Sequence, residues 1–498
     1  MNVLVTEKEL AGIAGAGNYF DDAALLETFR GDKRLGLSVA PRALIKPENA
    51  QQVESTVKWA NKNRVPLIPV SSGAPHYRDD TTPGVPGAVM VDLSGMKKIL
   101  SINQQHRMAV IEPGVTYGEL ASSLNEKGMF LSGPLAPKKN KSVVASLLER
   151  EPRLNAMHQW AFTDPLRCME VTWGDGNRMY TGEAGGAAMD LQQQWKEEKW
   201  QVEPVGPMML DFYRLLTGAQ GTMGIVTWAS VKCELAHKAY DAFIVPGSSF
   251  DSLSGFIQKV VHFRFSDELF ILNRVQLAAL LGSDSAEINS LCDKLPQWCA
   301  LVGVGGRDLL PEKRVAQQRA DIADIAQQEG LLVQQASAGI DAADIMKTAA
   351  KPCEGMYWKE RQKGAFYDIF FLTTLPQVNI FIEKMYSLAY SSGFETSLLG
   401  VYIQPVHLGS AYHVEFTLPY NPGDINDVQR VTALYKNASE TFASMNAYYS
   451  RPYGMWADLQ MNRDAANKKA LDELKFIFDP NLVLNPGKLN LPVERKEG

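Results

Sequence analysis

Residues 65–96 read VPLIPVSSGAPHYRDDTTPGVPGAVMVDLSGM, in which two short apolar runs flank a loop rich in small residues. The runs at 65–70 and 88–93 each have the length and composition of a buried strand. The segment between them, residues 71–87, is rich in Gly, Pro, Ser and Asp, which are typical of a long loop. Small residues directly after a strand let backbone N–H groups approach an anion closely. The loop is therefore a candidate phosphate-binding loop, with a plain surface turn as the alternative.

Three later segments have a similar composition. Residues 133–137 read GPLAP, and the small and hydroxyl residues of 141–146 follow them in what the sequence predicts to be a loop. Residues 218–227 read GAQGTMGIVT, with three glycines at three-residue spacing where a helix is expected to meet a strand. Residues 478–488 read FDPNLVLNPGK, and a helix is expected to end at Asp479 because the following proline disfavours helix there.

Helices and strands alternate on either side of these loops, which predicts an α/β lobe. Residues 167–173 and 178–181 predict a hairpin with a GDGN turn at 174–177. The other predicted elements are helices at 47–64, 117–127 and 210–216 and strands at 108–111 and 225–235.

The pattern changes after Leu235, where strand-like runs alternate with longer amphipathic helices. It predicts a second domain with a mixed or antiparallel sheet and helices on one face. A helix at 428–445 leads out of it, and the tail from residue 448 is expected to return to the first lobe. The predicted divisions are 1–236, 237–440 and 441–498. The predicted strands of the second domain are 242–245, 270–273, 300–304, 369–373, 400–404 and 412–418.

The composition excludes several classes of protein. A net charge of -6 argues against nucleic-acid binding, which needs clustered excess Lys and Arg. The five cysteines form no C-x-x-C pair, so they are expected to be reduced thiols and not metal or cluster ligands. No apolar run is long enough to span a membrane, and the first residues do not resemble a secretory signal. We therefore expect a cytoplasmic protein.

Neither a G-x-G-x-x-G after a strand nor a Walker P-loop is present. The loops above, with VDLSGM at 91–96, PGVTYGEL at 113–120 and the hairpin, occur in an order that resembles one family. It comprises the FAD-linked oxidases and dehydrogenases of the vanillyl-alcohol oxidase and para-cresol methylhydroxylase type, which include D-lactate and glycolate dehydrogenases. The resemblance covers about residues 40–235 and 440–491. It implies a two-lobed α+β or α/β fold with a non-Rossmann FAD-binding domain and a central mixed-sheet cap.

The resemblance also implies where FAD is bound. The usual second glycine loop is here SVVASLLER at 142–150, without glycines, and His76 is offset by one from the position that the family often links covalently to its flavin. Noncovalent FAD is therefore expected. The expected FAD contacts are Ser71, Ser72, Gly73, Ala74, Pro75, His76, Pro134, Ser142, Val143, Ala145, Asp164, Gly221, Thr222, Gly224, Ile225, Val226 and Asn485.

A cluster of polar residues at 402–415 and an Arg in the tail form the candidate catalytic site. In a strand, His413 and Glu415 point to the same face. The D-lactate branch holds a divalent metal on two histidines in a similar place, but the intervening residues and spacing differ here, so no metal is predicted. Arg451 is a candidate clamp for a carboxylate or phenolate, with a salt bridge of the tail as the alternative. The candidate catalytic residues are Arg451, Tyr449, His413, His407, Tyr402, Gln404 and Glu415.

These features predict an FAD-dependent dehydrogenase or oxidase that removes a hydride from a CH–OH or benzylic carbon of a small hydroxylated substrate. The substrate class is a 2-hydroxy acid or a para-hydroxylated aromatic. The electrons are expected to pass to dioxygen or to a partner protein, and a homo- or hetero-oligomer is expected. The alternative is a non-catalytic flavoprotein subunit of a larger electron-transfer complex.

Overall fold

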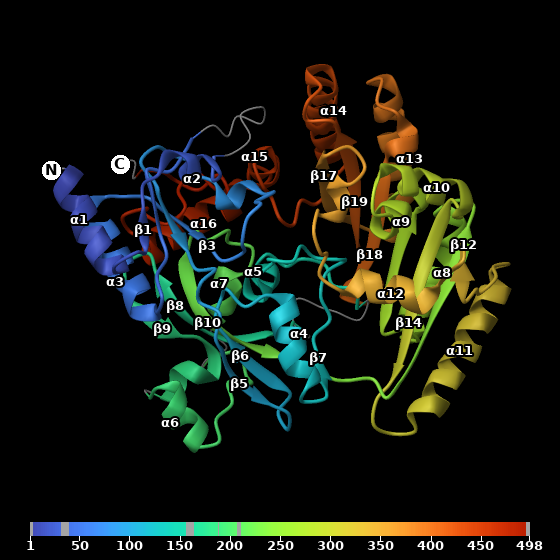
Figure 1. The fold of residues 1–498 in the computed structure, drawn as a ribbon, viewed down its shortest axis with the longest axis horizontal. Coiled ribbons are helices and arrows are strands. Elements are labelled where there is room, and N and C mark those ends of the chain that lie inside the picture. The colour runs from blue at the N-terminus through green and yellow to red at the C-terminus, as the bar shows by residue number, and fades with distance from the viewer. Residues whose placement is uncertain (1–2, 31–38, 156–163, 188, 207–210, 495–498) are drawn as a thin grey trace.

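The computed structural model describes residues 3–30, 39–155, 164–187, 189–206 and 211–494. Figure 1 shows two lobes side by side, one built from the first part of the chain and its last helices, the other from the middle of the chain. The predicted helix over 210–216 is α7 (Tyr213–Leu216), and its expected first residue, 210, lies outside the described residues. Among the described residues, no helix is both long and apolar enough to cross a membrane.

Residues 65–96 contribute two strands to a four-stranded sheet, whose strand order is β1-β2-β4-β3. The two predicted strands are β3 (Leu67–Val70) and β4 (Val89–Asp92), and they pair in parallel. Helix α3 (Ala50–Asn63) begins at Asn49, whose side chain accepts a hydrogen bond from the backbone of Gln52, as expected of an N-cap. The remaining strands of this sheet are β1 (Tyr19–Phe20) and β2 (Ala43–Ile45).

A second, five-stranded sheet of the first lobe is antiparallel in the order β5-β6-β10-β8-β9. The predicted hairpin is confirmed as β8 (Leu166–Trp173) and β9 (Arg178–Tyr180), with Gly176 in the left-handed region at φ +87°. The other strands are β5 (Ile99–Asn103), β6 (Met108–Ile111) and β10 (Gly224–Lys232), and short pieces complete the lobe: α1 (Val3–Ala14), α2 (Ala23–Glu27), α4 (Tyr117–Asn125), β7 (Met129–Phe130), α6 (Leu191–Lys196) and β11 (Glu234–Leu235).

The prediction of a loop at 141–146 is wrong. Helix α5 (Val143–Leu148) begins there, and the Ser142 hydroxyl oxygen caps it by accepting the N–H of Ala145 at 3.0 Å. The glycines that the family usually has here are absent, and residues with higher helix propensity take their place.

The second lobe has a six-stranded sheet in the order β12-β14-β13-β18-β19-β17, and every pairing in it is antiparallel. Its strands contain all the runs predicted after Leu235. They are β12 (Ala239–Gly247), β13 (Glu268–Asn273), β14 (Trp298–Gly306), β17 (Ala365–Thr373), β18 (Gly400–Val406) and β19 (Ala411–Tyr420).

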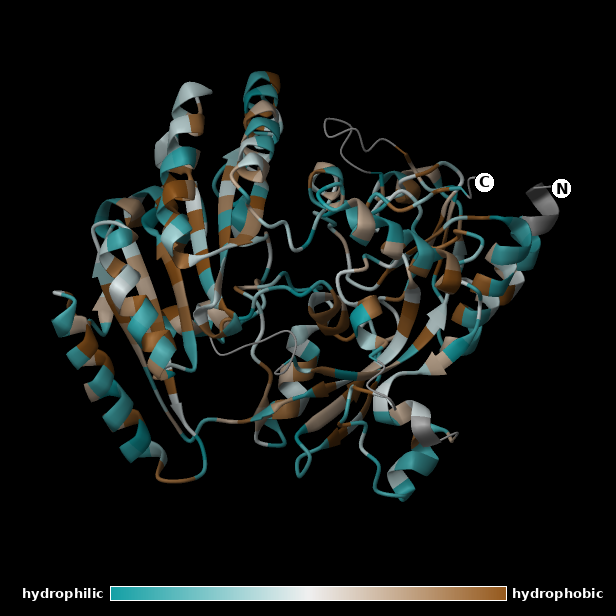
Figure 2. Cartoon of the chain, turned by 180° about the vertical axis from the view of Figure 1, so that it is seen from behind, coloured by the Kyte–Doolittle hydropathy of each residue, from teal (hydrophilic) through white to brown (hydrophobic). Residues whose placement is uncertain are grey.

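The prediction that helices cover one face of this sheet is wrong, because both faces are covered. Alternate strand residues pack in two separate cores, as the period of two requires. Figure 2 shows the outer helix α11 as largely hydrophilic and the strands beneath it as largely hydrophobic. One core contains α8 (Asp251–Phe263), α11 (Pro311–Gln328), α13 (Leu375–Ser391) and α14 (Ile425–Ser444); the other contains α9 (Arg274–Leu281), α10 (Ser285–Lys294) and α12 (Ala342–Ala350).

The tail returns to the first lobe, where Figure 1 shows the red helix α16 (Ala465–Phe478) among the blue elements, after α15 (Met455–Met461). Leu67 of β3 donates its N–H to Val483 and accepts the N–H of Asn485, so residues 483–485 extend the edge of the first sheet. Helix α16 ends at Phe478, as the sequence predicts. The last turn is fixed by a fully buried ion pair between Lys475 and Asp479 at 2.5 Å.

Candidate active site

Two cavities of about 890 Å³ each meet where the lobes face one another. The inner cavity lies in the first lobe, between the carboxyl end of β3, helix α5 and the glycine-rich turn at 218–226. Gly221 has φ +69°, and a Cβ there would come within 2.5 Å of Pro69, so only glycine lets the turn pack against β3. The walls of the inner cavity are therefore mostly small side chains and backbone.

The outer cavity lies between the lobes, against the cap sheet. Its aromatic walls include Tyr357, Trp358, Phe366 and Tyr402. The residues that line both cavities are Ser72, Asp80, Thr81, Glu149 and Arg451, so the two cavities adjoin.

The loop after β3 is held against the start of α5. The Ser72 hydroxyl oxygen accepts the N–H of Ser142 at 3.1 Å. Lys138 Nζ donates to the backbone oxygens of Gly73 and Pro75. Burial lowers the pKa of Lys138 to about 8, and within the described chain no carboxylate oxygen lies within 4.0 Å of this ammonium. The loop thus has a half-buried cation beside it, and no carboxylate of the described residues pairs with its charge.

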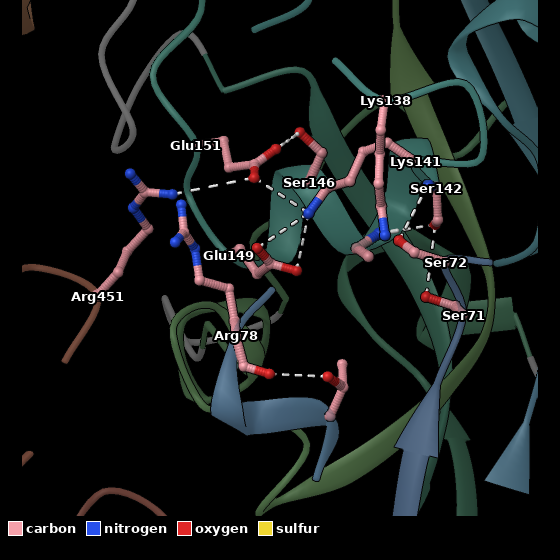
Figure 3. A network of polar contacts seen from close by, with 12 residues as sticks. Ser71, Ser72, Arg78, Lys138, Lys141, Ser142, Ser146, Glu149, Glu151 and Arg451 are labelled. Carbon is pink, nitrogen blue, oxygen red and sulfur yellow. Dashed lines mark hydrogen bonds and ion pairs between the residues drawn. The ribbon is translucent and has the colours of Figure 1, made fainter. Parts of the chain in front are cut away.

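A network of buried charges lies at the junction of the cavities (Figure 3). Lys141 bridges two carboxylates, at 3.0 Å from Glu149 and 3.1 Å from Glu151. Glu151 also accepts the Ser146 hydroxyl at 2.6 Å and lies 4.0 Å from the guanidinium of Arg451. Burial disfavours the charged forms, but the two carboxylates raise the pKa of Lys141 above its ordinary value, so the ammonium stays charged.

The cap contributes a second network, from the face of β17, β18 and β19 that is opposite the α13–α14 core. Lys359 Nζ lies 2.8 Å from Asp368 and 2.5 Å from Glu415, and Arg78 of the first lobe lies 3.2 Å from Asp368. Burial opposes ionisation of Glu415, but Lys359 and His413 hold its pKa well below the usual range. The network joins the two lobes through charge-assisted contacts.

Nine of the predicted cofactor residues line one of the two cavities, and the other eight line neither. Gly73, Ala74 and Pro75 lie in the loop that Lys138 binds, and Ser142 and Val143 start helix α5. Three others are held by hydrogen bonds within the protein: the Thr222 hydroxyl donates to the backbone oxygen of Ala219, Asp164 accepts the Tyr213 hydroxyl, and Asn485 Nδ2 donates to the backbone oxygens of Asp80 and Gln220. Those that line a cavity are Ser71, Ser72, His76, Pro134, Ala145, Gly221, Gly224, Ile225 and Val226.

Of the predicted catalytic residues, Arg451, Tyr402 and Glu415 line the outer cavity. Gln404 lies behind them, where it accepts the Tyr402 hydroxyl at 3.1 Å and donates to Leu269. His413 is buried, 3.6 Å from Glu415, and burial lowers its pKa.

Two other predicted catalytic residues lie away from the cavity linings. The hydroxyl of Tyr449 donates to the backbone oxygen of Ser439, and its ring stacks on Trp456 at 4.9 Å. His407 is half-buried in the turn between β18 and β19.

Several lining residues carry charge and escaped the sequence reasoning. A loop rich in charged residues gives no sign of which side chains are buried, so the sequence alone does not single out Arg78, Asp80, Lys138 or Lys141. Lys359 lies in a short 3₁₀ turn (Trp358–Glu360) without periodicity. Glu149 and Glu151 follow the helix that was expected to be a loop. The departure from the glycine pattern at 142–150 was the available signal that this region is built differently.

Comparison with known proteins indicates the cofactor, FAD. Residues 41–149 match the FAD binding domain family. The chain is 22% identical to D-2-hydroxyglutarate dehydrogenase of Stutzerimonas stutzeri, over 97% of this chain and 98% of that protein. It is 26% identical to the 4-cresol dehydrogenase flavoprotein subunit of Pseudomonas putida, over 33% of this chain and 31% of that one.

Solved structures share the fold over nearly the whole chain. 4-Ethylphenol oxidase from Gulosibacter chungangensis superposes with a TM-score of 0.82 at 16% identity, covering 98% of this chain and 97% of that one. p-Cresol methylhydroxylase superposes with a TM-score of 0.81 at 16% identity, covering 99% and 98%.

The fold and the FAD-binding domain define a flavin-dependent oxidoreductase. The chain resembles the FAD-linked oxidases and dehydrogenases of the vanillyl-alcohol oxidase and para-cresol methylhydroxylase type.

The residues present fit FAD. The walls of the inner cavity are mostly small side chains, and the half-buried Lys138 offers a positive charge beside the loop at 71–76, where a diphosphate would be held. The adjoining outer cavity has room for a substrate beside a flavin ring at the junction. When bound, FAD supplies the two-electron acceptor, and the protein supplies binding, orientation and charge.

Proposed function

We propose that the protein oxidises a small 2-hydroxy acid to the corresponding 2-oxo acid. One observation carries this proposal. The guanidinium of Arg451 lines both cavities, is 5% exposed, and has its nearest carboxylate, Glu151, at 4.0 Å. A planar guanidinium that is not engaged in a close ion pair is suited to bind a carboxylate through two hydrogen bonds.

The chain's own residues divide the work in this proposal. Arg451 binds the substrate carboxylate at the junction of the cavities, and Glu151 and Phe370 hold the guanidinium from behind. Tyr402 and Glu415 face the same space from the cap, and the aromatic walls exclude water. Gln404 and His413 keep Tyr402 and Glu415 in place from within the cap sheet.

A para-hydroxylated aromatic is the second candidate substrate. The outer cavity is walled by Tyr77, Tyr357, Trp358 and Phe366, which suit an aromatic ring, and Arg451 would then stabilise a phenolate. The proteins with the most similar folds named above act on p-cresol and 4-ethylphenol, whereas the full-length relative acts on a 2-hydroxy acid.

The wider setting is also part of the proposal. Residues 1–236 and 441–498 form the FAD-binding lobe, and 237–440 form the substrate cap. Electrons leave the reduced flavin to dioxygen or to an acceptor protein, in the cytoplasm, from a homo- or hetero-oligomer. The 4-cresol dehydrogenase relative is itself named as one subunit of a larger assembly. A non-catalytic flavoprotein subunit is the rival reading, and direct reduction by a substrate separates the two.

The test is anaerobic bleaching of the flavin. Purified protein is reconstituted with FAD and mixed with a panel of 2-hydroxy acids and para-alkylphenols while the absorbance near ~450 nm is followed. A 2-hydroxy acid is expected to bleach the flavin, and an alkylphenol that bleaches it faster would establish the second candidate. FAD-loaded protein that no member of the panel bleaches would support the non-catalytic reading.

A further inference from the structure

Asp80 lies in the short 3₁₀ turn η2 (Asp79–Thr81) that follows the loop after β3. Asp80 lines both cavities, at the point where they adjoin. Its side-chain Oδ1 is buried and has no hydrogen-bond partner among the described residues, whereas its backbone oxygen accepts a hydrogen bond from the Asn485 amide at 2.8 Å. The backbone is thus fixed, while a carboxylate oxygen remains available to a ligand.

The other carboxylates that line these cavities are all neutralised. Glu149 accepts two hydrogen bonds from Lys141 and one from the Tyr453 hydroxyl. Glu151 is bound by Lys141 and Ser146, and Asp368 and Glu415 share Lys359. In the described part of the chain, Asp80 is the lining carboxylate with no Lys, Arg or His nitrogen within 4.0 Å. It is therefore the one whose proton affinity is not suppressed by a paired cation.

The charges around Asp80 act in both directions. Burial, the carboxylate of Glu149 at the end of α5, and Asp79 in the same turn raise its pKa, whereas Lys141 and Lys488 lower it. The balance brings the pKa of Asp80 to about 7. Asp80 and Glu149 are two carboxylates in one site with different partners. Such a pair can divide two roles, with the unpaired Asp80 as the acid–base group and the paired Glu149 as a fixed charge.

We propose that Asp80 is the catalytic base, a role that rests on the proposed function. The substrate O–H bond breaks and its proton goes to Asp80, while the C–H bond breaks and its electron pair leaves as hydride to oxidised FAD. The C–O bond becomes C=O, so the two-electron oxidation of the substrate matches the two-electron reduction of FAD. Arg451 holds the carboxylate at the same junction, which places the hydroxyl carbon between the two lobes.

The experiment compares Asp80→Asn with the wild type by anaerobic stopped flow at saturating substrate. The amide keeps the shape of the side chain and removes the base, so the rate of flavin reduction is expected to fall by roughly 10²- to 10⁴-fold. In the wild type, the rate is expected to rise with pH through about 7, because the base must be unprotonated, and this limb disappears in Asp80→Asn. FAD content and substrate Kd, measured by flavin spectral change, should be retained.

Asp79→Asn is the matched control in the same turn. Asp79 pairs with Lys488 at 3.3 Å and is not among the residues that line the inner or outer cavity. Removing its negative charge eases ionisation of Asp80, so the pH limb should shift to lower pH while the plateau rate stays near that of the wild type. An infrared carboxylic-acid band that titrates across the neutral range in the wild type, and is missing in Asp80→Asn, is the readout independent of turnover.

The possible failures are distinguishable. Wild-type bleaching by a 2-hydroxy acid, with Asp80→Asn bleached at the same rate and with the same pH profile, would overturn the assignment of Asp80 alone. A wild type that holds FAD and is bleached by no hydroxylated substrate would overturn the proposed function and the assignment with it. If Asp80→Asn loses FAD, the proposal then depends on the infrared titration, and a wild type without that band refutes it.

Discussion

Arg451 enters the site from the tail and stacks its guanidinium over the Phe370 ring, with Cζ 4.1 Å from the ring centroid. Arg451→Lys retains the charge but loses the planar pair of donors. A charge-assisted hydrogen bond is worth about 1.5–3 kcal/mol, so kcat/KM for the substrate is expected to fall roughly ten- to hundredfold. The measurement is the dependence of flavin reduction on substrate concentration, beside FAD content.

Arg463→Lys serves as the control for that substitution. Arg463 also lies in the tail, but its guanidinium donates to the backbone oxygens of Ala443 and Ala447, outside both cavity linings. It should leave kcat/KM near the wild-type value. Equal values for Arg451→Lys and the wild type would mean that the substrate anion is bound elsewhere.

Single residues divide into those the sequence could place and those it could not. Arg451, Tyr402 and Glu415 were predicted for the site, and they line the outer cavity. Tyr449 was predicted from the same tail segment, but its side chain points into the α14–α15 packing. Tyr449 and Arg451 lie in an irregular segment without helical or strand periodicity. The sequence therefore cannot show which of the two side chains faces the cavity.

At the level of elements, strand alternation places the polar residues of the cap on one face. Lys359 then neutralises carboxylates from two of these strands, Asp368 of β17 and Glu415 of β19. Lys359→Met leaves Glu415 buried without its ammonium partner, whereas Asp368 keeps Arg78 at 3.2 Å, and the loss is expected to cost about 3–5 kcal/mol of unfolding free energy at neutral pH. Urea unfolding of the two proteins measures this difference.

The pH dependence of that loss has a definite sign. The pKa of Glu415 is lower in the folded protein than its unfolded value of 4.5. The ionised Glu415 therefore stabilises the fold above that pH, and this stabilisation is lost as the pH falls. The difference between Lys359→Met and the wild type should therefore shrink in acid. Lys363→Met is the control, because Lys363 lies 3.6 Å from Asp427 in a partly exposed pair worth about 0–1 kcal/mol. A loss from Lys359→Met that is no larger than the control's would contradict the structural role of Lys359.

The elements themselves were largely predictable. Apolar runs and turn residues predicted β3, β4, the β8–β9 hairpin and every strand of the cap sheet. The start of α5 is not predicted, because residues 142–150 occupy the place of a glycine-rich loop. The residues present there have a higher helix propensity than glycine and form a helix instead. Helices on both faces of the cap sheet were missed because a single strand's alternation does not show what covers each side.

Over the whole molecule, the proposed FAD site is the inner cavity of the first lobe, and we expect FAD to be retained there without a covalent link. His76 lines the outer cavity and packs against Phe29 at 5.3 Å, and burial with nearby Lys138 and Lys141 lowers its pKa to about 4. Acid precipitation is expected to release the yellow flavin into the supernatant, measured by its absorbance. Colour that remains in the washed, denatured pellet would show a covalent bond, and His76→Ala would then identify whether His76 forms it.

The global arrangement was predicted from motif order, whereas the junction was not. The series of loops predicts which segments surround FAD, but it does not predict that Arg78 of the first lobe pairs with Asp368 of the cap, 290 residues later in the sequence. Pairings of this kind depend on how the lobes meet, and no local pattern encodes them.

The buried ammonium of Lys475 donates to the backbone oxygens of Thr222 and Leu484, and residues 483–485 complete the edge beside β3. These residues leave the ribosome about 240 positions after Leu235, which at roughly 5–20 residues per second is a delay on the order of 10–50 s. Throughout that interval the nascent first lobe has an open strand edge and an unsealed core. Its solubility during synthesis therefore depends on chaperones or on the pace of translation, and a prematurely terminated chain would aggregate although it contains every phosphate-loop residue.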